Sequence, residues 1–477
     1  MPAVLSPSKS RTHRSQITVK PHKESRLLLL PAELLSDILK FLSWRDVMRV
    51  RLTCTHLRKL SKTAWRSIAC RESRHTWWLE QPVDAHSEDE LEFLYLRRQS
   101  AEIGYTMMAN GAAPRQRTGF IPNLSNCFRL LPGGRWLLTA TDTGSVLYFD
   151  LDIPEVIAKV LIAGKSSRCA TFITLDLDTT SPTLMFNLAL SKQNAYTTMP
   201  QEPLEVWQVN IVTEKTGRGI NLQAVCLKSF FVEPPGWVHS LSLLGGSLAY
   251  SHAGSDQLVT AVVSWTSIEA PNYSKRIFFP AHAECTHLLP GDLLLSLCED
   301  GACVLPLSSL PEVKAIHSFD DIERIVAAPI AAFGYPMHHA VSNSTFHEGS
   351  ARLVMYSDEA LRGLVVEYNN PESKPNPGIQ VVKLADVSED FDSQISVSED
   401  FILAWDENGG LVLRHVAWSD NQIVRIASVC LDQSVPFCSL AEYACVLDMT
   451  SGRIVVQQLA GKFTVLDFAF LELQKVS

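Results

Sequence analysis

The sequence contains no apolar run long enough to cross a membrane and no segment typical of a secretory signal. The longest uncharged apolar stretch, from Ile325 to Met337, has 13 residues and contains two prolines, whereas a spanning helix needs about 20 apolar residues. The first 25 residues are basic and rich in serine, lack an apolar segment and contain three prolines that would interrupt a targeting helix. We therefore expect no association with a membrane and a disordered basic tail over residues 1–25.

Close cysteine pairs are also missing. The chain has 11 cysteines, an odd number, and no Cys-x-x-Cys pair occurs. Structural zinc sites use closely spaced ligands of that kind, and secreted disulfide frameworks usually have an even number of cysteines. The pattern predicts reduced, mostly buried cysteines in an intracellular protein, whose localisation would be cytoplasmic, nuclear or both.

Motifs of known catalytic sites are absent as well. Gly164-Lys165-Ser166 resembles the end of a phosphate-binding loop, but Lys159 stands where that loop needs its first glycine. No Gly-x-Ser-x-Gly elbow and no His-Glu-x-x-His motif occurs. Histidines at 338, 339 and 347 lie in a polar stretch that provides no defined frame for a metal. We expect no enzyme activity, no cofactor and no metal.

Charge is divided unevenly along the chain. Residues 1–80 carry 16 Lys/Arg and 6 Asp/Glu, and the remainder carries 26 Lys/Arg and 45 Asp/Glu. A length of 477 residues suggests two or three folding units, and such asymmetry indicates a different partner for each part. A net charge of −19 over residues 81–477 repels phosphates, so we expect no nucleic acid as a partner.

Residues 26–72 have the pattern of a small helical module. Apolar residues at helical spacing form a stripe of double width, namely Leu34, Leu35, Ile38, Leu39 and Leu42. Ser43 with Asp46 can open a second helix, and Thr55 can open a third. A stripe wider than a helical hairpin needs for its own core indicates surface left over for a partner.

This segment resembles an F-box, the module that docks substrate receptors onto a cullin-type ubiquitin ligase. The resemblance covers about a tenth of the chain and rests on the following residues in the family's order: Leu30-Pro31, Glu33, Leu34, Ile38-Leu39, Leu42, Asp46-Val47, Leu57 and Trp65. It implies a three-helix fold that binds a Skp-type adaptor and, through it, a cullin. The adaptor-binding residues it suggests are Leu30, Pro31, Leu34, Leu35, Ile38, Leu42, Val47 and Val50. The residues alone do not separate those that would face the adaptor from those in the module's own core.

Residues 73–118 are expected to form a helical linker. Ser87 and Glu90 make a capping box that opens a helix over residues 88–100. Residues 101–118 look like a loop, because they contain Gly111, Pro114 and two arginines.

From residue 119 to 477 the sequence shows short β-type runs separated by polar turns. Predicted hairpins centre near Gly144, Gly254, Gly301, Gly363, Gly409 and Gly452, and residues 185–190 with 206–212 can supply one more. Repeats of about 50 residues built from strands are typical of a β-propeller of four-stranded blades. We expect seven blades, with six or eight left open, and a pair of β-sandwiches as the alternative. The final run, residues 463–470, would either close the ring or stand as an outer strand.

In its rhythm this region resembles divergent WD-repeat proteins, as in a fungal-type F-box substrate receptor, although the Gly-His dipeptide is missing and the one Trp-Asp, at 405–406, precedes a turn. The fold class expected is therefore α+β multidomain, an F-box followed by a propeller. The resemblance implies a substrate-recognition subunit of an SCF-type ubiquitin ligase whose propeller binds a target protein. The alternatives are a non-ligase interaction scaffold, a propeller enzyme, or a structural propeller with an accidental F-box-like hairpin.

The charge of the large domain bears on its target. Eleven arginines follow residue 119, roughly one or two per predicted blade, so a phosphate-binding cluster is geometrically possible. The net charge of −19 over residues 81–477 instead favours a target that presents a Lys/Arg-rich or neutral stretch. We expect the binding of such a target to weaken as the salt concentration rises.

Overall fold

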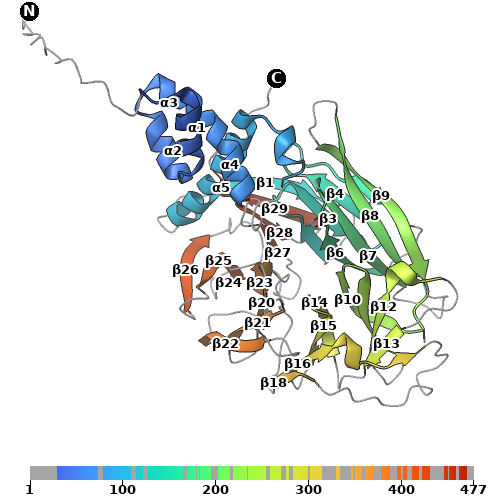
Figure 1. Ribbon diagram of the computed structural model, residues 1–477. Helices are drawn as coiled ribbons and strands as arrows, with labels where there is room; N and C mark the ends of the chain where they lie inside the picture. The colour runs from blue at the N-terminus through green and yellow to red at the C-terminus, as the bar shows by residue number, and fades with distance from the viewer. Residues whose placement is uncertain are drawn as a thin grey trace, which may run out of the picture. The chain divides into compact units, whose positions relative to one another are not determined.

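Figure 1 shows the computed structural model of the chain. The structure describes residues 29–72, 79–108, 114–121, 127–164, 169–178, 180–181, 183–194, 202–214, 219–233, 235–253, 258–269, 275–278, 283–298, 301–313, 329–333, 345–347, 350–356, 360–368, 378–386, 395–398, 401–405, 411–417, 422–429, 445–448, 451–457 and 461–469. The predicted basic tail, residues 1–25, lies outside them. Two compact units are present, Met1–Ile68 and Ala69–Ser477.

The first unit is helical and follows its capping signals. Helices α1 (Ala32–Lys40), α2 (Trp44–Arg51) and α3 (Thr55–Leu60) come in succession, and a short 3₁₀ turn, η2 (Ser61–Thr63), leads into α4 (Ala64–Glu72). The Ser43 hydroxyl accepts a hydrogen bond from the backbone N–H of Asp46 at 3.2 Å, which confirms the predicted start of the second helix.

The predicted third helix is divided in two. Its N-cap is Cys54, whose sulfur accepts the N–H of Leu57 at 3.4 Å, and Thr55 is the first helical residue. At the break, the Ser61 and Thr63 hydroxyls donate to the carbonyls of Arg58 and Leu60, at 2.9 and 2.8 Å. Such side-chain bonds compete with the helical ladder, which accounts for the 3₁₀ turn between α3 and α4.

After the last residues of α4, the second unit has a 3₁₀ turn, η3 (Val83–Ala85), and one long helix, α5 (Glu88–Met108). The capping box is confirmed: the Ser87 N–H donates to the Glu90 carboxylate at 2.8 Å and the Glu90 N–H donates to the Ser87 hydroxyl at 3.2 Å. The helix is 21 residues long, so the prediction of a loop after residue 100 is wrong.

Helix α5 continues because one face of its second half is buried. Tyr105 packs against Phe468 with ring centroids 4.7 Å apart. Gly104 does not end the helix but permits this approach, because a Cβ there would lie 2.0 Å from the Phe468 carbonyl oxygen. Tertiary packing thus outweighs the weak helix propensity of glycine.

The described strands form seven antiparallel sheets (Figure 1). In chain order, the first sheet contains β2 (Cys127–Leu130), β3 (Trp136–Ala140), β4 (Val146–Asp150) and β5 (Lys159–Ile162), and the second contains β6 (Cys169–Leu177), β7 (Met185–Asn194), β8 (Leu204–Thr213) and β9 (Gly219–Phe230). The third contains β10 (Trp237–Leu244), β11 (Ser247–Ala253), β12 (Leu258–Ser264) and β13 (Lys275–Phe278) and is extended by β17 (Glu312–Val313). The fourth contains β14 (Ala283–Leu289), β15 (Leu293–Cys298), β16 (Gly301–Pro306) and β18 (Ala331–Phe333). Two 3₁₀ turns, η4 (Trp265–Ser267) and η5 (Leu307–Ser309), follow β12 and β16.

The last three sheets repeat this order. They are β19 (Thr345–His347), β20 (Ser350–Tyr356), β21 (Ala360–Glu367) and β22 (Gly378–Asp386); β23 (Ile395–Ser398), β24 (Phe401–Trp405), β25 (Leu411–Ala417) and β26 (Gln422–Val429); and β27 (Cys445–Asp448), β28 (Arg453–Gln457) and β29 (Lys462–Asp467), joined by β1 (Arg115–Phe120).

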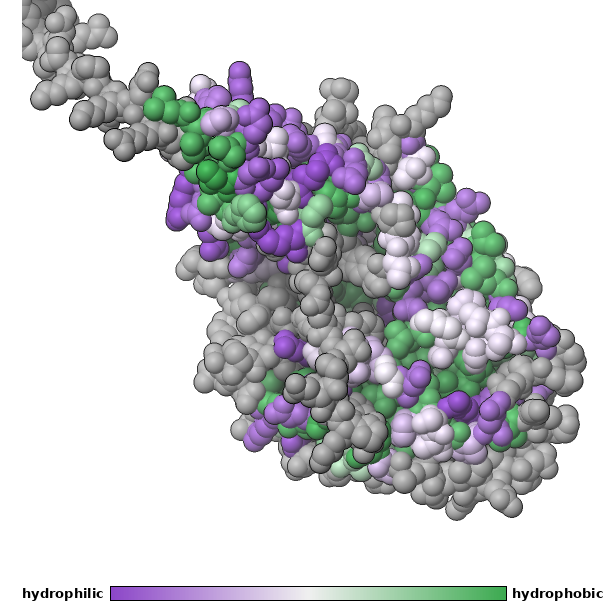
Figure 2. Space-filling view, in the orientation of Figure 1, coloured by the Kyte–Doolittle hydropathy of each residue, from purple (hydrophilic) through white to green (hydrophobic). Residues whose placement is uncertain are grey.

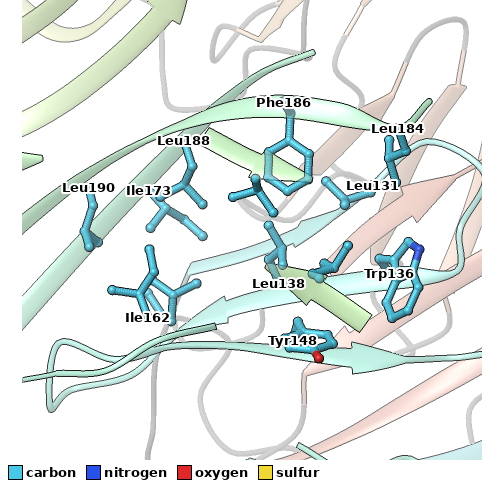
Figure 3. Close-up of a cluster of buried hydrophobic side chains, with 14 residues drawn as sticks. Leu131, Trp136, Leu138, Tyr148, Ile162, Ile173, Leu184, Phe186, Leu188 and Leu190 are labelled. Atoms are coloured by element: carbon cyan, nitrogen blue, oxygen red, sulfur yellow. The ribbon is translucent and has the colours of Figure 1, made fainter. Parts of the chain in front are cut away.

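Each sheet packs on the next, and the last packs on the first. Figure 3 shows the cluster between the first and second sheets, where Leu138 and Tyr148 meet Ile173, Phe186 and their neighbours. Equivalent apolar clusters join the second sheet to the third, the third to the fourth, the fourth to the fifth and the sixth to the seventh. Strands β22 and β26 contact each other between the fifth and sixth. The packing is circular, as in a propeller, and not face to face as in paired sandwiches.

The circle is closed by a strand from before the first sheet. Strand β1 pairs antiparallel with β29, with Arg117 opposite Val465. Phe463 of β29 is buried against Phe128 and Phe149 of the first sheet. The final run therefore lies inside the last sheet, and residues 115–118, predicted as loop, supply part of the closing strand.

The predicted hairpins have mixed outcomes. Gly144 and Gly452 adopt positive φ, 74° and 70°, in the turns after β3 and β27, as expected for tight turns. The turns containing Gly254 and Gly409 lie outside the described residues, although their flanking strands are present. Gly363 was wrongly placed in a turn, because it lies within β21 opposite Val354. The mostly β propeller class is confirmed, while the number of blades stays a prediction.

Candidate docking surface

Helix α1 has two apolar faces with different environments. Leu35 and Leu39 are 2% and 3% exposed and form the core of the helical unit with Val47 and Leu57. Leu34 and Ile38, on the other face, are 51% and 44% exposed. The double-width stripe thus divides into a core stripe and an uncovered stripe.

The uncovered stripe extends beyond α1 at both ends. Leu34, Ile38 and the C-cap residue Phe41 follow one another at spacings of four and three, which places them on one side of α1, and Leu30 precedes the N-cap Pro31. Leu30 is 37% and Phe41 is 84% exposed. Figure 2 shows hydrophobic residues gathered on this part of the molecule, beside the point where the described chain begins. We call Leu30, Leu34, Ile38 and Phe41 the α1 face.

The eight residues suggested for adaptor binding divide into three groups by exposure. Leu30, Pro31, Leu34 and Ile38 are exposed, Leu42 and Val50 are half-buried, and Leu35 and Val47 are buried. Leu35 and Val47 would therefore support the module from within, while the other six could reach a partner. Whether any of them binds an adaptor stays a prediction.

Three exposed apolar side chains of this unit were not predicted from the sequence. Leu29, Phe41 and Leu52 are 68%, 84% and 77% exposed. Phe41 could have been found, because it continues the spacing of Leu34 and Ile38 by one further turn. Leu52 is the C-cap of α2, and no periodic signal marks it.

The surface around the α1 face is basic. Residues 29–68 contain eight Lys/Arg and three Asp/Glu. Two of the acids are paired within their own helices, since Asp37 accepts from Lys40 at 2.8 Å and Asp46 accepts from Arg49 at 2.9 Å. Hydrogen bonds from Ser43 and then Arg49 lower the pKa of Asp46. Arg45, Arg49, Arg58 and Lys59 are exposed, which leaves this unit with a positive surface.

The second unit contains a buried ion network that holds the first and last sheets together. The Arg453 guanidinium contacts Asp152 at 2.6 Å and Asp467 at 2.5 Å. Arg117 of β1 contacts the same Asp467 at 2.6 Å, and Arg97 of α5 reaches Asp152 at 3.3 Å. Burial opposes ionisation of Asp152, but Arg453, Arg97 and Arg135 outweigh it and lower its pKa well below the usual value.

A second cluster lies in the same region. Arg135 forms a two-pronged pair with Asp150 at 3.0 and 2.7 Å and also contacts Glu80 at 2.6 Å. Glu80 accepts a further hydrogen bond from the Trp136 indole at 2.8 Å. These contacts fix the segment before α5 onto the first sheet.

Several described arginines of the propeller are used for structure. Arg135 and Arg453 are buried in ion pairs with aspartates. Arg129 and Arg276 donate to the carbonyls of Phe128 and Leu307. Arg168, Arg218 and Arg324 lie outside the described residues. Arg129, Arg135, Arg276 and Arg453 are thus engaged in contacts within the fold.

Neither a membrane helix nor a metal site is found in the described ranges. No helix there is both long and apolar enough to cross a bilayer. No group of three or more His, Cys, Asp or Glu within those ranges is placed to hold a metal ion.

Comparison with known proteins identifies the helical unit. Residues 27–71 match the family model described as F-box-like. No curated protein matches the chain.

Solved structures similar to this chain are WD40 domains. The WD40 domain of SCAP from fission yeast is 11% identical, with a TM-score of 0.41, over 73% of this chain and 85% of that one. The RRP9 WD40 repeats are 11% identical, with a TM-score of 0.41, over 75% and 99%. The β-propeller domain of Cps50 (Swd1) from Myceliophteria thermophila is 12% identical, with a TM-score of 0.40, over 74% and 99%. At such scores these neighbours add nothing to the fold assignment, which rests on strand order and packing.

The helical unit has the fold, the apolar spacing and the family match of one known docking module, and the sheets after it pack in a closed circle. The chain thus carries an F-box-like domain at residues 27–71, followed by a mostly β domain of the propeller type.

Proposed function

We propose that the protein is a substrate receptor of a cullin-based ubiquitin ligase. The F-box-like domain docks a Skp-type adaptor, and the propeller binds the protein to be ubiquitinated. The chain contributes no catalytic group to the transfer. Its effect is proximity, because tethering raises the effective concentration of the target's lysines near the activated ubiquitin.

The observation that supports docking is the α1 face. Leu34 and Ile38 leave about half of their side-chain surface in water, and uncovered apolar clusters of this kind mark interaction sites. Interface energy concentrates in a few apolar side chains that become fully desolvated. The face lies on a rigid helix backed by Leu35 and Leu39, so little ordering is needed on binding.

Charge supports the same partner. The family resemblance implies an acidic adaptor, and the surface around the α1 face is basic, with exposed Arg45, Arg49 and Lys59. Complementary charge speeds association and fixes orientation more than it adds affinity. We therefore expect the apolar residues to control affinity and the basic residues to control the association rate and its salt dependence.

The docking experiment compares two double variants of the full chain. Leu34→Ala with Ile38→Ala removes exposed apolar surface from α1, whereas Val225→Ala with Leu227→Ala removes it from β9, where these residues are 50% and 38% exposed. The first should weaken binding to a purified Skp-type adaptor by about 2–5 kcal/mol, as expected for core interface residues. The second should bind normally, and unchanged binding by the α1 variant would refute the docking assignment.

A second experiment separates a ligase receptor from an interaction scaffold. Affinity purification of the full chain under proteasome and cullin inhibition should recover adaptor, cullin and target together. Recovery of the adaptor without a cullin would support the scaffold. Loss of the cullin in the Leu34→Ala, Ile38→Ala variant would show that the α1 face is the point of attachment.

The target is proposed to present a neutral or Lys/Arg-rich segment. Residues 81–477 carry a net charge of −19, and the described arginines that contact carboxylates are already paired. Binding to peptides from recovered targets should weaken as salt rises. Tight binding that requires phosphorylation of the peptide would contradict this assignment of target chemistry.

A further inference from the structure

Cys285 and His287 lie on the same side of β14. They are two residues apart on a strand, so both side chains point to one face. The Cys285 sulfur is 3.2 Å from Nε2 of His287, and the Ser240 hydroxyl donates to the same sulfur at 3.7 Å. A thiol that faces an imidazole and a hydroxyl donor has the surroundings of an activated nucleophile.

The neighbouring strand holds this arrangement in place. Ser240 of β10 accepts the N–H of Thr286 at 3.0 Å, and Ser242 accepts the N–H of Leu288 at 2.8 Å. The pairing of β14 with β15 shifts register just before Cys285. Irregularities of this kind redirect side chains and are frequent next to functional sites.

The electrostatics agree with the geometry. Burial alone would raise the pKa of the Cys285 thiol, but the charge of His287 and the hydrogen bonds from His287 and Ser240 bring the pKa below its usual value. Burial also opposes the charge on His287, and the adjacent thiolate outweighs it and raises the pKa of the imidazole. Both residues keep part of their surface exposed.

Cys169 provides a contrast within the same chain. It is also half-buried, but its sulfur lies 3.4 Å from the Thr171 hydroxyl. Burial raises the pKa of Cys169. Cys169, whose sulfur contacts a hydroxyl and not an imidazole, thus has a pKa shifted in the direction opposite to that of Cys285.

We propose that Cys285 and His287 form a thiolate–imidazolium pair and that Cys285 is a site of covalent modification by hydrogen peroxide. The thiolate sulfur attacks one peroxide oxygen, a sulfur–oxygen bond forms and the oxygen–oxygen bond breaks. The departing hydroxide takes the proton of the His287 imidazolium and leaves as water. Cysteine is thereby oxidised by two electrons to a sulfenic acid, and the peroxide is reduced. This site is independent of the docking function proposed above.

The first test measures thiolate formation in the full chain. Brief iodoacetamide labelling from about pH 5 to pH 9, a range that covers ordinary cysteine ionisation, is read out by mass spectrometry for Cys285 and Cys169. The labelling midpoint of Cys285 should lie at lower pH in the native chain than in the urea-unfolded chain, and that of Cys169 should not. A Cys285 that labels only after unfolding, or with an unshifted midpoint, would overturn the proposal.

The second test addresses the histidine and the peroxide. The variant His287→Gln should move the Cys285 midpoint back toward that of the unfolded chain, with Cys169 as internal reference. Should this variant not fold, the wild-type pH profile decides alone. Treatment with hydrogen peroxide and dimedone should tag Cys285 and not Cys169, and the tag should be lost in Cys285→Ser. A thiolate that forms but gives no dimedone adduct would refute the peroxide reaction.

Discussion

At the scale of the residue, leucines that are adjacent in the sequence have different roles. Leu35 is 2% exposed in the core of the helical unit, and Leu34 beside it is 51% exposed. A helix turns by about 100° per residue, so neighbours point in different directions. The two leucines should therefore respond differently to the same truncation.

We predict that Leu35→Ala destabilises the F-box-like domain and that Leu34→Ala does not. Truncating a buried leucine costs about 2–5 kcal/mol, because apolar contact is lost and a cavity remains. Truncating an exposed one usually changes stability by less than about 0.5 kcal/mol. Amide hydrogen exchange of residues 29–68 in the full chain measures the difference. Equal loss of protection in both variants would contradict the division of α1 into two faces.

A second residue-scale prediction concerns Asp152, whose carboxylate faces Arg453, Arg97 and Arg135. Its pKa in the folded chain lies below the ordinary value of 3.8. The folded chain thus binds this proton less readily than the unfolded chain. The stabilisation is fully present above pH 3.8 and is lost as the pH falls below it.

The test is Asp152→Asn, which leaves the buried guanidinium of Arg453 short of one carboxylate. Breaking a buried pair from one side costs about 3–5 kcal/mol. Urea unfolding at neutral pH should show the loss, and at acid pH the variant and the wild type should converge. Asp178→Asn is the control, because Asp178 is a partly exposed turn carboxyl whose hydrogen bonds come from Thr180 and not from a buried guanidinium. Equal effects of the two substitutions would argue against the network.

At the scale of the element, closure depends on close approach between β1 and β29. Gly119 of β1 is opposite Phe463, and a Cβ on Gly119 would lie 2.2 Å from the Phe463 ring. That ring is fully buried and packs edge-on against Phe149 at 5.1 Å between centroids. The Phe463 ring therefore has no space in which to move away from a methyl group added at Gly119.

We predict that Gly119→Ala destabilises the propeller, whereas Gly246→Ala is nearly neutral. Overpacking a filled core costs about 1–3 kcal/mol. The nearest atom to a Cβ on Gly246 lies 3.5 Å away, which is ordinary contact. Thermal unfolding of both variants gives the comparison. A Gly119→Ala variant as stable as the Gly246→Ala control would show that β1 can shift away from Phe463.

The elements that sequence predicted are those with local signals. Ser43 and the Ser87–Glu90 pair correctly predicted where their helices begin, and the apolar runs around Gly144 and Gly452 correctly predicted two hairpins. Strand β1 carried no such signal, because Arg115–Phe120 is mostly polar and its partner β29 lies about 350 positions away. The end of α5 was missed for a related reason: only contact with Phe468 shows that Gly104 belongs in a helix.

The two faces of α1 illustrate the same limit at the candidate site. The sequence showed a stripe too wide for one core, which correctly indicated surplus apolar surface. It did not show which leucines were surplus, since that depends on where α2 and α3 pack. Phe41 was within reach of the periodic pattern, whereas the exposed position of Leu52 depends on the helix end.

At the scale of the whole molecule, the last sheet is assembled from both ends of the second unit. It takes β27, β28 and β29 from the C-terminal end and β1 from before the first sheet. Arg453 of β28 also donates to the carbonyl of Gly134, in the turn between β2 and β3, at 2.8 Å, and pairs with Asp152, which follows β4. The stability of the first sheet therefore depends on residues more than 300 positions away.

Truncation gives the test of this dependence. Removing residues 436–477 deletes β27–β29, leaves β1 without its partner and exposes Phe128 of the first sheet and Leu403 and Leu413 of the sixth. Because a closed ring has no unpaired inner faces, its loss should be cooperative and extend beyond the deleted sheet. We expect the shortened chain to be protease-sensitive throughout residues 115–435 and to lose its native circular dichroism spectrum. Removal of residues 470–477 alone, which follow β29 and the short segment after it, should leave the spectrum and the protease resistance unchanged. A shortened chain ending at residue 435 that keeps the protease resistance of the intact protein would mean that the seven sheets are independent in stability, and that pairing of β1 with β29 contributes little to holding the circle closed.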